Sequence, residues 1–116
     1  MTWNQYNRKN KYSNKKTEVD GYKFDSHKEA KYYLYLKSRQ ENKEIKNLRL
    51  QPVFTLQENF THEGKTIRKI KYVADFSYHE DDVFTVIDVK GMKTDVYKLK
   101  KKLFLFKYPS IKFIEV

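Results

Sequence analysis

The chain contains no cysteine, and its three histidines, His27, His62 and His79, lie far apart in the sequence. The lack of cysteine excludes a disulfide framework and a zinc–thiolate site, and the histidines show no metal-ligand spacing. No segment approaches the roughly 18 to 20 apolar residues of a membrane span. The N-terminus also lacks the apolar stretch of a signal peptide. We therefore expect a cytoplasmic protein that does not contact a membrane.

Acidic residues are few beside the basic ones: 15 Asp and Glu face 25 Lys and Arg, which gives a net charge of +10. This excess predicts a polyanionic partner, and nucleic acid is the commonest one. The length of 116 residues fits one domain with a modest core. Ten tyrosines, eight phenylalanines and one tryptophan supply apolar surface for that core, although aromatic rings can also stack on unpaired bases.

Residues 1–16 contain five basic residues, no acidic residue and no hydrophobic periodicity. We interpret them as a flexible basic N-terminal arm, which either contacts DNA or only keeps the chain soluble. Residues 17–116 then form a single domain. Its first element is a small ribbon turning at Asp20-Gly21, a dipeptide that favours tight hairpins.

A helix is predicted from about Ser26 to Asn42, because Ser26 and Glu29 have the spacing of a capping box. At 100° per residue its apolar side chains share one arc, which also includes the Glu29 carboxylate. They are Ala30, Tyr33, Leu34 and Leu36. Two interpretations of Glu29 stay open: an ordinary capping residue, or an acid directed into a site on the sheet beneath the helix.

Extended structure is predicted for 45–56, where Pro52 requires an edge or bent strand. A loop over 58–66 follows, and a second extended segment is predicted for 67–78. In 67–78 the alternation places five residues on one face: Ile70, Tyr72, Ala74, Phe76 and Tyr78. After a turn at 79–82, a strand over 83–90 places Asp88 and Lys90 on one face with Phe84 and Val86.

A second helix should begin at Thr94 as N-cap and stop at Tyr108-Pro109. Its apolar stripe would be Val96, Leu99, Leu103 and Phe106. A last strand over 111–116 would complete a parallel strand–helix–strand unit. The predicted order of helix, three strands, helix and strand indicates a mixed α+β or α/β fold with helices against one sheet.

If the hairpin closes symmetrically on Asp81-Asp82, Glu80 lies opposite Val83 and Asp75 lies opposite Asp88. Two carboxylates facing each other across strands repel unless a cation neutralises them. Carboxylate oxygens without cysteine suit Mg²⁺ or Mn²⁺, and Lys90 lies on the same face as Asp88. Two acids, a lysine and a cation are the groups needed for metal-assisted phosphodiester hydrolysis. The alternative is a charged, solvent-facing side of a sheet.

These residues also match a known pattern. Asp75, twelve intervening residues and then Asp88-Val89-Lys90 resemble the PD-(D/E)XK signature of restriction-endonuclease-like nucleases, and the predicted element order is similar to their αβββαβ core. The segments FDSHKEA, LQPVFTL, YVADFSY, VIDVKG and TDVYKLKKKLF together resemble a small family of phage and prophage nuclease-like proteins, across roughly 19–116. Ala74 stands where proline is usual, and the second acid is Asp rather than the more frequent Glu.

The resemblance implies specific roles. Asp75 and Asp88 would bind the metal, Lys90 would assist the attacking water, and Glu29 would complete the acidic cluster. It implies an Mg²⁺- or Mn²⁺-dependent endodeoxyribonuclease, encoded by a phage or prophage and active in the bacterial cytoplasm. Small basic enzymes of this fold often resolve branched DNA such as Holliday junctions, usually as homodimers.

The helix after the second acid carries the expected contacts to duplex or branched DNA, because its lysines follow an N-terminus that offers free N–H groups to phosphate. These residues are Lys93, Thr94, Lys98, Lys101 and Lys102. Two other classes of protein stay open: a non-catalytic nucleic-acid-binding module of the same fold, and a structural protein of a nucleoprotein assembly.

Overall fold

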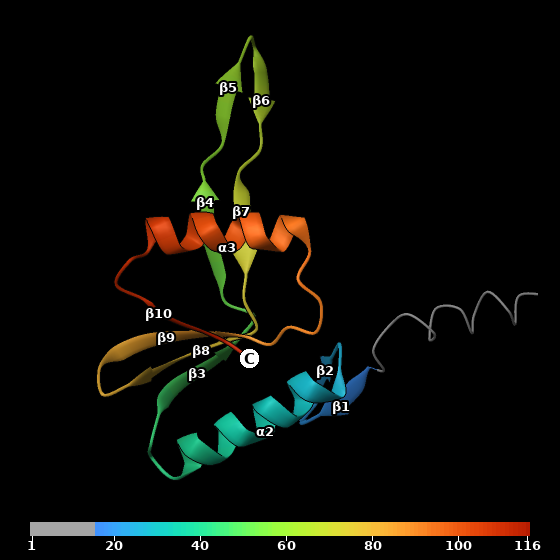
Figure 1. Cartoon of the computed structure of the whole chain (residues 1–116), viewed down its shortest axis with the longest axis vertical. Coiled ribbons are helices and arrows are strands. Elements are labelled where there is room, and N and C mark those ends of the chain that lie inside the picture. Colours follow the sequence, from blue (N-terminus) through green and yellow to red (C-terminus); the bar gives the residue numbers. More distant parts are fainter. Residues whose placement is uncertain (1–15) are drawn as a thin grey trace, which may run out of the picture.

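The computed structural model describes residues 16–116, so the predicted N-terminal arm lies outside the described residues except for Lys16. The described chain has a mixed α+β fold with two helices and several small sheets (Figure 1). The elements are β1 (Thr17–Val19), β2 (Tyr22–Phe24), α2 (His27–Glu41), β3 (Lys46–Leu50), β4 (Val53–Gln57), β5 (Phe60–His62), β6 (Lys65–Ile67), β7 (Ile70–Val73), β8 (Phe76–Glu80), β9 (Val83–Asp88), α3 (Asp95–Lys107) and β10 (Lys112–Glu115).

A four-stranded sheet in the order β10-β9-β8-β3 forms the centre of the fold. β3, β8 and β9 are antiparallel neighbours, whereas β10 runs parallel to β9 and is reached through α3. This confirms the predicted parallel strand–helix–strand unit and the edge position of the strand before Pro52. The two helices lie on opposite sides of the sheet, and each covers its own buried cluster (Figure 1).

Both strands at one side of the sheet bend at the same level. β3 is separated from β4 by Gln51 and Pro52, and Gln51 has a φ of 51°. β7 is separated from β8 by Ala74 and Asp75. Two backbone hydrogen bonds join the bends: Gln51 N–H donates to Asp75 O (2.9 Å), and Ala74 N–H donates to Pro52 O (3.1 Å). The paired strands therefore leave the central sheet together.

This bend corrects the single strand that was predicted for 67–78. Tyr72 and Ala74 pack in the cluster under α3, whereas Phe76 and Tyr78 pack in the cluster under α2. The alternation of side chains assigns a common face only while a strand stays straight. The bend at Asp75 moves the same set of alternating residues from one face of the sheet to the other.

Beyond the bend, residues 53–73 form a two-stranded ribbon that projects past α3 (Figure 1). β4 pairs with β7, and further out β5 pairs with β6 around Glu63-Gly64, whose φ values are 49° and 76°. The loop predicted for 58–66 is therefore wrong, because most of it belongs to β5 and β6. Every residue from 57 to 71 is exposed, so the outer ribbon rests on interstrand hydrogen bonds without a core.

Helix α2 closely follows its prediction. Ser26 is the N-cap, its Oγ accepts the Glu29 N–H at 3.1 Å, and Asn42 is the C-cap. Ala30, Tyr33 and Leu36 are buried, but Leu34, predicted in the same arc, is exposed. The ribbon β1–β2 turns at Asp20-Gly21 as predicted, with positive φ at both residues.

Helix α3 has the predicted N-cap at Thr94 and ends before Tyr108, yet it turns a different face inward. The predicted stripe, Val96, Leu99, Leu103 and Phe106, is exposed. The helix instead buries Tyr97 and Phe104, and the Phe104 ring lies 4.9 Å from that of Phe54 and 5.2 Å from that of Tyr72. The segment carries two stripes at helical spacing, and the buried one is the one whose aromatic rings pack with the rings of β4, β7 and β10.

Neither helix in residues 16–116 combines the length and apolar character needed to cross a bilayer.

The orientation of α3 can be tested with two phenylalanines of the same helix. Phe104 is fully buried, whereas Phe106 is 86% exposed. We expect Phe104→Ala to lower the free energy of unfolding by about 3 to 5 kcal/mol through the cavity it leaves. Phe106→Ala should change it by no more than about 0.5 kcal/mol. Urea unfolding followed by circular dichroism measures both, and a larger loss from Phe106→Ala would contradict this orientation.

Candidate active site

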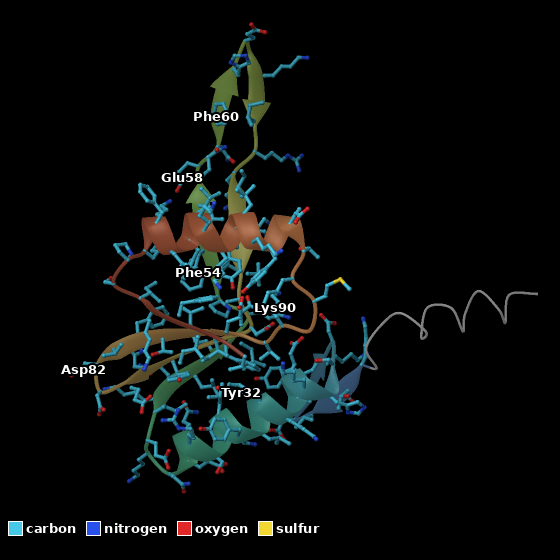
Figure 2. All side chains as sticks on the ribbon, viewed as in Figure 1. Tyr32, Phe54, Glu58, Phe60, Asp82 and Lys90 are labelled. Atoms are coloured by element: carbon cyan, nitrogen blue, oxygen red, sulfur yellow. The ribbon has the colours of Figure 1, made fainter. Side chains whose placement is uncertain are left out.

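The predicted site residues meet where the bent strand, the end of β9 and the first turn of α2 come together. Asp75 lies at the bend between β7 and β8, and Asp88 is the last residue of β9. Lys90 follows two residues later, and Glu29 belongs to the first turn of α2. Lys90 lies near the middle of the molecule, between α3 and α2 (Figure 2).

The predicted register of the hairpin is confirmed over five pairs, from Glu80 opposite Val83 to Phe76 opposite Ile87. Asp75 lies just beyond this ladder. Its backbone N–H donates to Ile87 O (3.1 Å), and its carboxylate Oδ2 accepts the Val89 N–H at 2.6 Å. The direct cross-strand pair with Asp88 is therefore not part of the ladder, because the strand has already begun to bend. Asp75 is joined to β9 through Val89 instead.

Asp88 is the most deeply buried charged residue of the group, with 1% of its surface exposed. The Tyr72 hydroxyl donates to its Oδ2. Its Oδ1 forms an ion pair with Lys90 Nζ at 3.1 Å and has no hydrogen-bond partner. A buried carboxylate must be paired to remain charged, and here one lysine supplies the opposite charge.

Lys90 is held on two further sides. Its ammonium nitrogen lies 4.4 Å from the centroid of the Tyr97 ring, within the range of a cation–π contact. Its backbone N–H donates to Val116 O, and Val116 N–H donates to Asp88 O, both at 2.9 Å. The last residues of the chain thereby fix the backbone on both sides of Val89.

Glu29 is both a residue of the helix cap and an acid near the candidate site, the two interpretations that the sequence left open. Its backbone N–H takes part in the cap with Ser26. Its side chain is half-buried and lies near Lys90 and Asp75, since burial raises the pKa of Glu29 while the charge of Lys90 and a hydrogen bond with Asp75 lower it. The cap uses the main chain of Glu29, so the carboxylate is available to the cluster.

Burial, together with the negative charges of Asp88 and Glu29, raises the pKa of Asp75 to about 7, although the Val89 N–H and the Lys90 ammonium oppose the shift. Burial also raises the pKa of Glu29, with a further contribution from the charge of Asp25. The carboxyl groups of Asp75 and Glu29 are therefore harder to ionise than exposed ones. Glu29 and Asp75 both line a cavity of about 380 Å³ that also includes Tyr22 and Gln51.

The fit of this cluster to a metal rests on its donors. As they stand, no three His, Cys, Asp or Glu side chains in the described part of the chain are gathered closely enough to hold an ion. Two observations nevertheless suit Mg²⁺ or Mn²⁺: the candidate ligands are all carboxylates, and Asp88 Oδ1 is buried without a hydrogen-bond donor. Glu29, Asp75 and Asp88 are the side chains that could hold the ion.

The chain matches, over residues 9–116, the family model described as "Protein of unknown function (DUF1064)". The chain belongs to the DUF1064 family. No curated protein and no solved structure matches the chain.

In this DUF1064 chain, the residues predicted to contact DNA fall into separate groups. Lys93 and Lys101 pair with Glu115, at 2.9 and 3.3 Å. Lys98 and Lys102 are exposed on α3, and Thr94 is the N-cap. The first two lysines are therefore partly neutralised, which the sequence could not show because Glu115 lies on a different element.

Several residues of the site were missed by the sequence analysis. Tyr72 contacts Asp88 and Tyr97 contacts Lys90, and the sequence does not distinguish either tyrosine from an ordinary core residue. Glu115 accepts the Tyr97 hydroxyl, and that bond, with Lys93 and Lys101, lowers the pKa of Glu115 to about 2. The one signal in the sequence for Tyr72 is its place in the same alternating segment, 67–78, that contains Asp75.

The pKa of Asp75 predicts a pH-dependent loss of stability. Between about pH 4 and pH 7 the folded carboxyl keeps a proton that the unfolded chain has lost, so its contribution to the free energy of unfolding falls as the pH rises through this range. Asp75→Asn removes this titration. We expect the free energy of unfolding of the variant, relative to wild type, to increase from pH 5 to pH 8.

Urea unfolding in EDTA at unit steps of pH measures this difference. Asp82→Asn is the control, because Asp82 lies in the exposed β8–β9 turn, and its difference from wild type should not follow the same trend (Figure 2). Parallel pH profiles for Asp75→Asn and wild type would contradict the raised pKa.

Proposed function

We propose that this chain is a metal-dependent endonuclease that hydrolyses phosphodiester bonds in DNA, of the PD-(D/E)XK type. The observation that carries the proposal is the contact between Asp88 Oδ1 and Lys90 Nζ, at 3.1 Å, beside Asp75 at the strand bend. The nearby Glu29 supports it, because a carboxylate from the first helix belongs to the pattern that the sequence resembles.

The proposed roles follow from where each group lies. Glu29, Asp75 and Asp88 would hold a divalent cation, which when bound supplies a Lewis acid and an acidified water. Asp75 must be ionised to hold a cation, so its raised pKa weakens binding below neutral pH. The Lys90 ammonium, fixed over the Tyr97 ring, would orient the attacking water and stabilise the negative charge that develops on the phosphate.

DNA is the proposed substrate because the net charge of +10 favours a polyanion. We further propose that the enzyme selects branched structures, in the manner of a junction resolvase in phage recombination or DNA processing. The described domain is small and its projecting ribbon is only two strands wide, which suits reading of shape better than of sequence. The proposed location is the cytoplasm of the bacterial host of a phage or prophage.

We propose a homodimer, because symmetric cutting of two strands requires two sites. The exposed stripe of α3 supports this proposal. Val96, Leu99, Leu103 and Phe106 follow one another at intervals of three, four and three residues, the spacing of a helix that packs against another helix. A twofold axis would bring the same stripe of a second copy against it.

A non-catalytic nucleic-acid-binding module is the second candidate. The observation that favours it is the burial of Asp88 between Tyr72 and Lys90, which leaves only 1% of the residue exposed. A cation would have to take the place of the lysine at Oδ1. In such a module the pair would serve only to stabilise the fold.

Cleavage of labelled DNA separates the two candidates. With Mg²⁺ or Mn²⁺, wild type should cut a four-way junction in preference to fork, linear duplex and single-stranded DNA of shared sequence. Asp88→Ala and Lys90→Ala should each lower the rate at least about a hundredfold, because the first removes a ligand of the cation and the second removes the ammonium that acts on the reacting phosphate. EDTA should abolish cutting in every case.

Asp82→Ala serves as the matched control, since this aspartate is exposed at the tip of the same hairpin and should cut like wild type (Figure 2). Circular dichroism must show that all variants fold. Equal cutting by Asp88→Ala and wild type would refute the endonuclease, and binding without any cutting would establish the module.

The dimer can be tested by light scattering. Wild type at micromolar concentration should show twice the chain mass of 14.2 kDa. Leu99→Glu should show the monomer mass, because it buries an unpaired charge in the proposed interface. Leu105→Glu, on the opposite side of α3, should remain dimeric. A monomeric wild type would contradict the proposal.

A further inference from the structure

A second cavity, of about 290 Å³, lies on the α3 side of the candidate active site. Three lysines from three parts of the chain line it: Lys71 from β7, Lys90 from the segment after β9, and Lys100 from α3. Tyr72, Thr94 and Tyr97 complete the part of its wall nearest the site. None of the residues predicted from the sequence to bind DNA lines this cavity except Thr94.

The charges around this cavity are poorly balanced. Lys90 is paired with Asp88, but within residues 16–116 neither Lys71 nor Lys100 has a carboxylate within 4.0 Å. Lys93, just before α3, and Lys101 of α3, in contrast, share Glu115. Like charges that line one small space repel each other, and an anion between them removes that cost. Lys93 and Lys101 beside this cavity are thus paired, whereas Lys71 and Lys100, two of the three lysines inside it, have no carboxylate partner.

We infer that this cavity binds a phosphate of the nucleic-acid backbone, adjacent to the phosphate that is cut. The inference rests on the proposed function for its position relative to the chemistry. The Lys90 side chain fixes that position, because it contacts Asp88 and also lines the cavity. Only this side chain would separate an anion in the cavity from the carboxylate cluster. The cavity would set where the backbone crosses the site.

The chemistry of the wall favours a phosphodiester without selecting a base. The two tyrosine hydroxyls that line the cavity are already engaged, Tyr72 with Asp88 and Tyr97 with Glu115. The remaining side-chain donors are the ammonium groups and the Thr94 hydroxyl, which bind phosphate oxygens and carry no information about sequence. This agrees with the proposed recognition of DNA shape.

Binding of duplex DNA in EDTA tests the inference without requiring cleavage. Fluorescence anisotropy would compare wild type with Lys71→Ala, Lys100→Ala and Lys112→Ala over a range of salt concentrations. Lys112 is an exposed lysine of β10 outside the cavity and controls for the loss of one positive charge.

We expect Lys71→Ala and Lys100→Ala each to weaken binding about fivefold to tenfold near physiological salt, and to reduce the slope of log K against log salt by about 1. Lys112→Ala should change both quantities much less. Lys100→Arg keeps the charge and should bind like wild type, which separates a phosphate contact from damage to the helix.

Affinities for Lys71→Ala and Lys100→Ala equal to that of Lys112→Ala would overturn the inference, as would a wild type that does not bind DNA. The outcome does not depend on cutting. If these two variants bind weakly but wild type never cuts with Mn²⁺, phosphate binding in the cavity is supported and the endonuclease proposal is refuted. If wild type cuts but the two variants bind like the control, the endonuclease proposal is supported and phosphate binding in the cavity is refuted.

Discussion

The carboxylate of Asp88 has almost no contact with water, and a charge in that position must be compensated by its neighbours. Each neighbour comes from a different part of the chain. Tyr72 reaches it from the ribbon strand β7, and Lys90 reaches it from the segment after β9. Tyr97 of α3 then supports Lys90, and Val116 bonds to the backbone of both Asp88 and Lys90. The packing of β7, α3 and β10 around one side chain is therefore also the packing of the candidate site.

The strand bend brings Asp75 into the candidate site beside Asp88. A straight strand would have continued the ladder through Asp75 and left its side chain in a regular cross-strand position. The bend frees the Asp75 carboxylate from the ladder, so that it accepts the Val89 N–H and lies beside Glu29. The same bend directs β4 and β7 out of the sheet, so the projecting ribbon and the acidic cluster have one geometric cause.

How far the sequence predicts this structure depends on whether the deciding interaction is local. The register of the β8–β9 hairpin and the caps at Ser26 and Thr94 were predicted correctly, because turn chemistry and capping act within a few residues. The inward face of α3 was not, since two stripes compete and only the shape of the sheet decides between them. The bend at Asp75 depends on Gln51 and Pro52, more than twenty positions earlier. The pairing of Lys93 and Lys101 likewise depends on how β10, the strand after α3, places Glu115 beside the helix.

The backbone bonds between Val116 and the segment around Val89 have a consequence for the order in which the site forms during synthesis. β10 is parallel to β9, and it follows all other described elements in the chain. A ribosome therefore completes both helices and the whole ribbon before the strand that closes the sheet has emerged. Until then Asp88 and Lys90 sit on an unpaired edge, without the bonds that fix their backbone. A nascent chain would carry every acid of the cluster and still lack an assembled site, so the geometry arises only once β10 and Val116 have been synthesised.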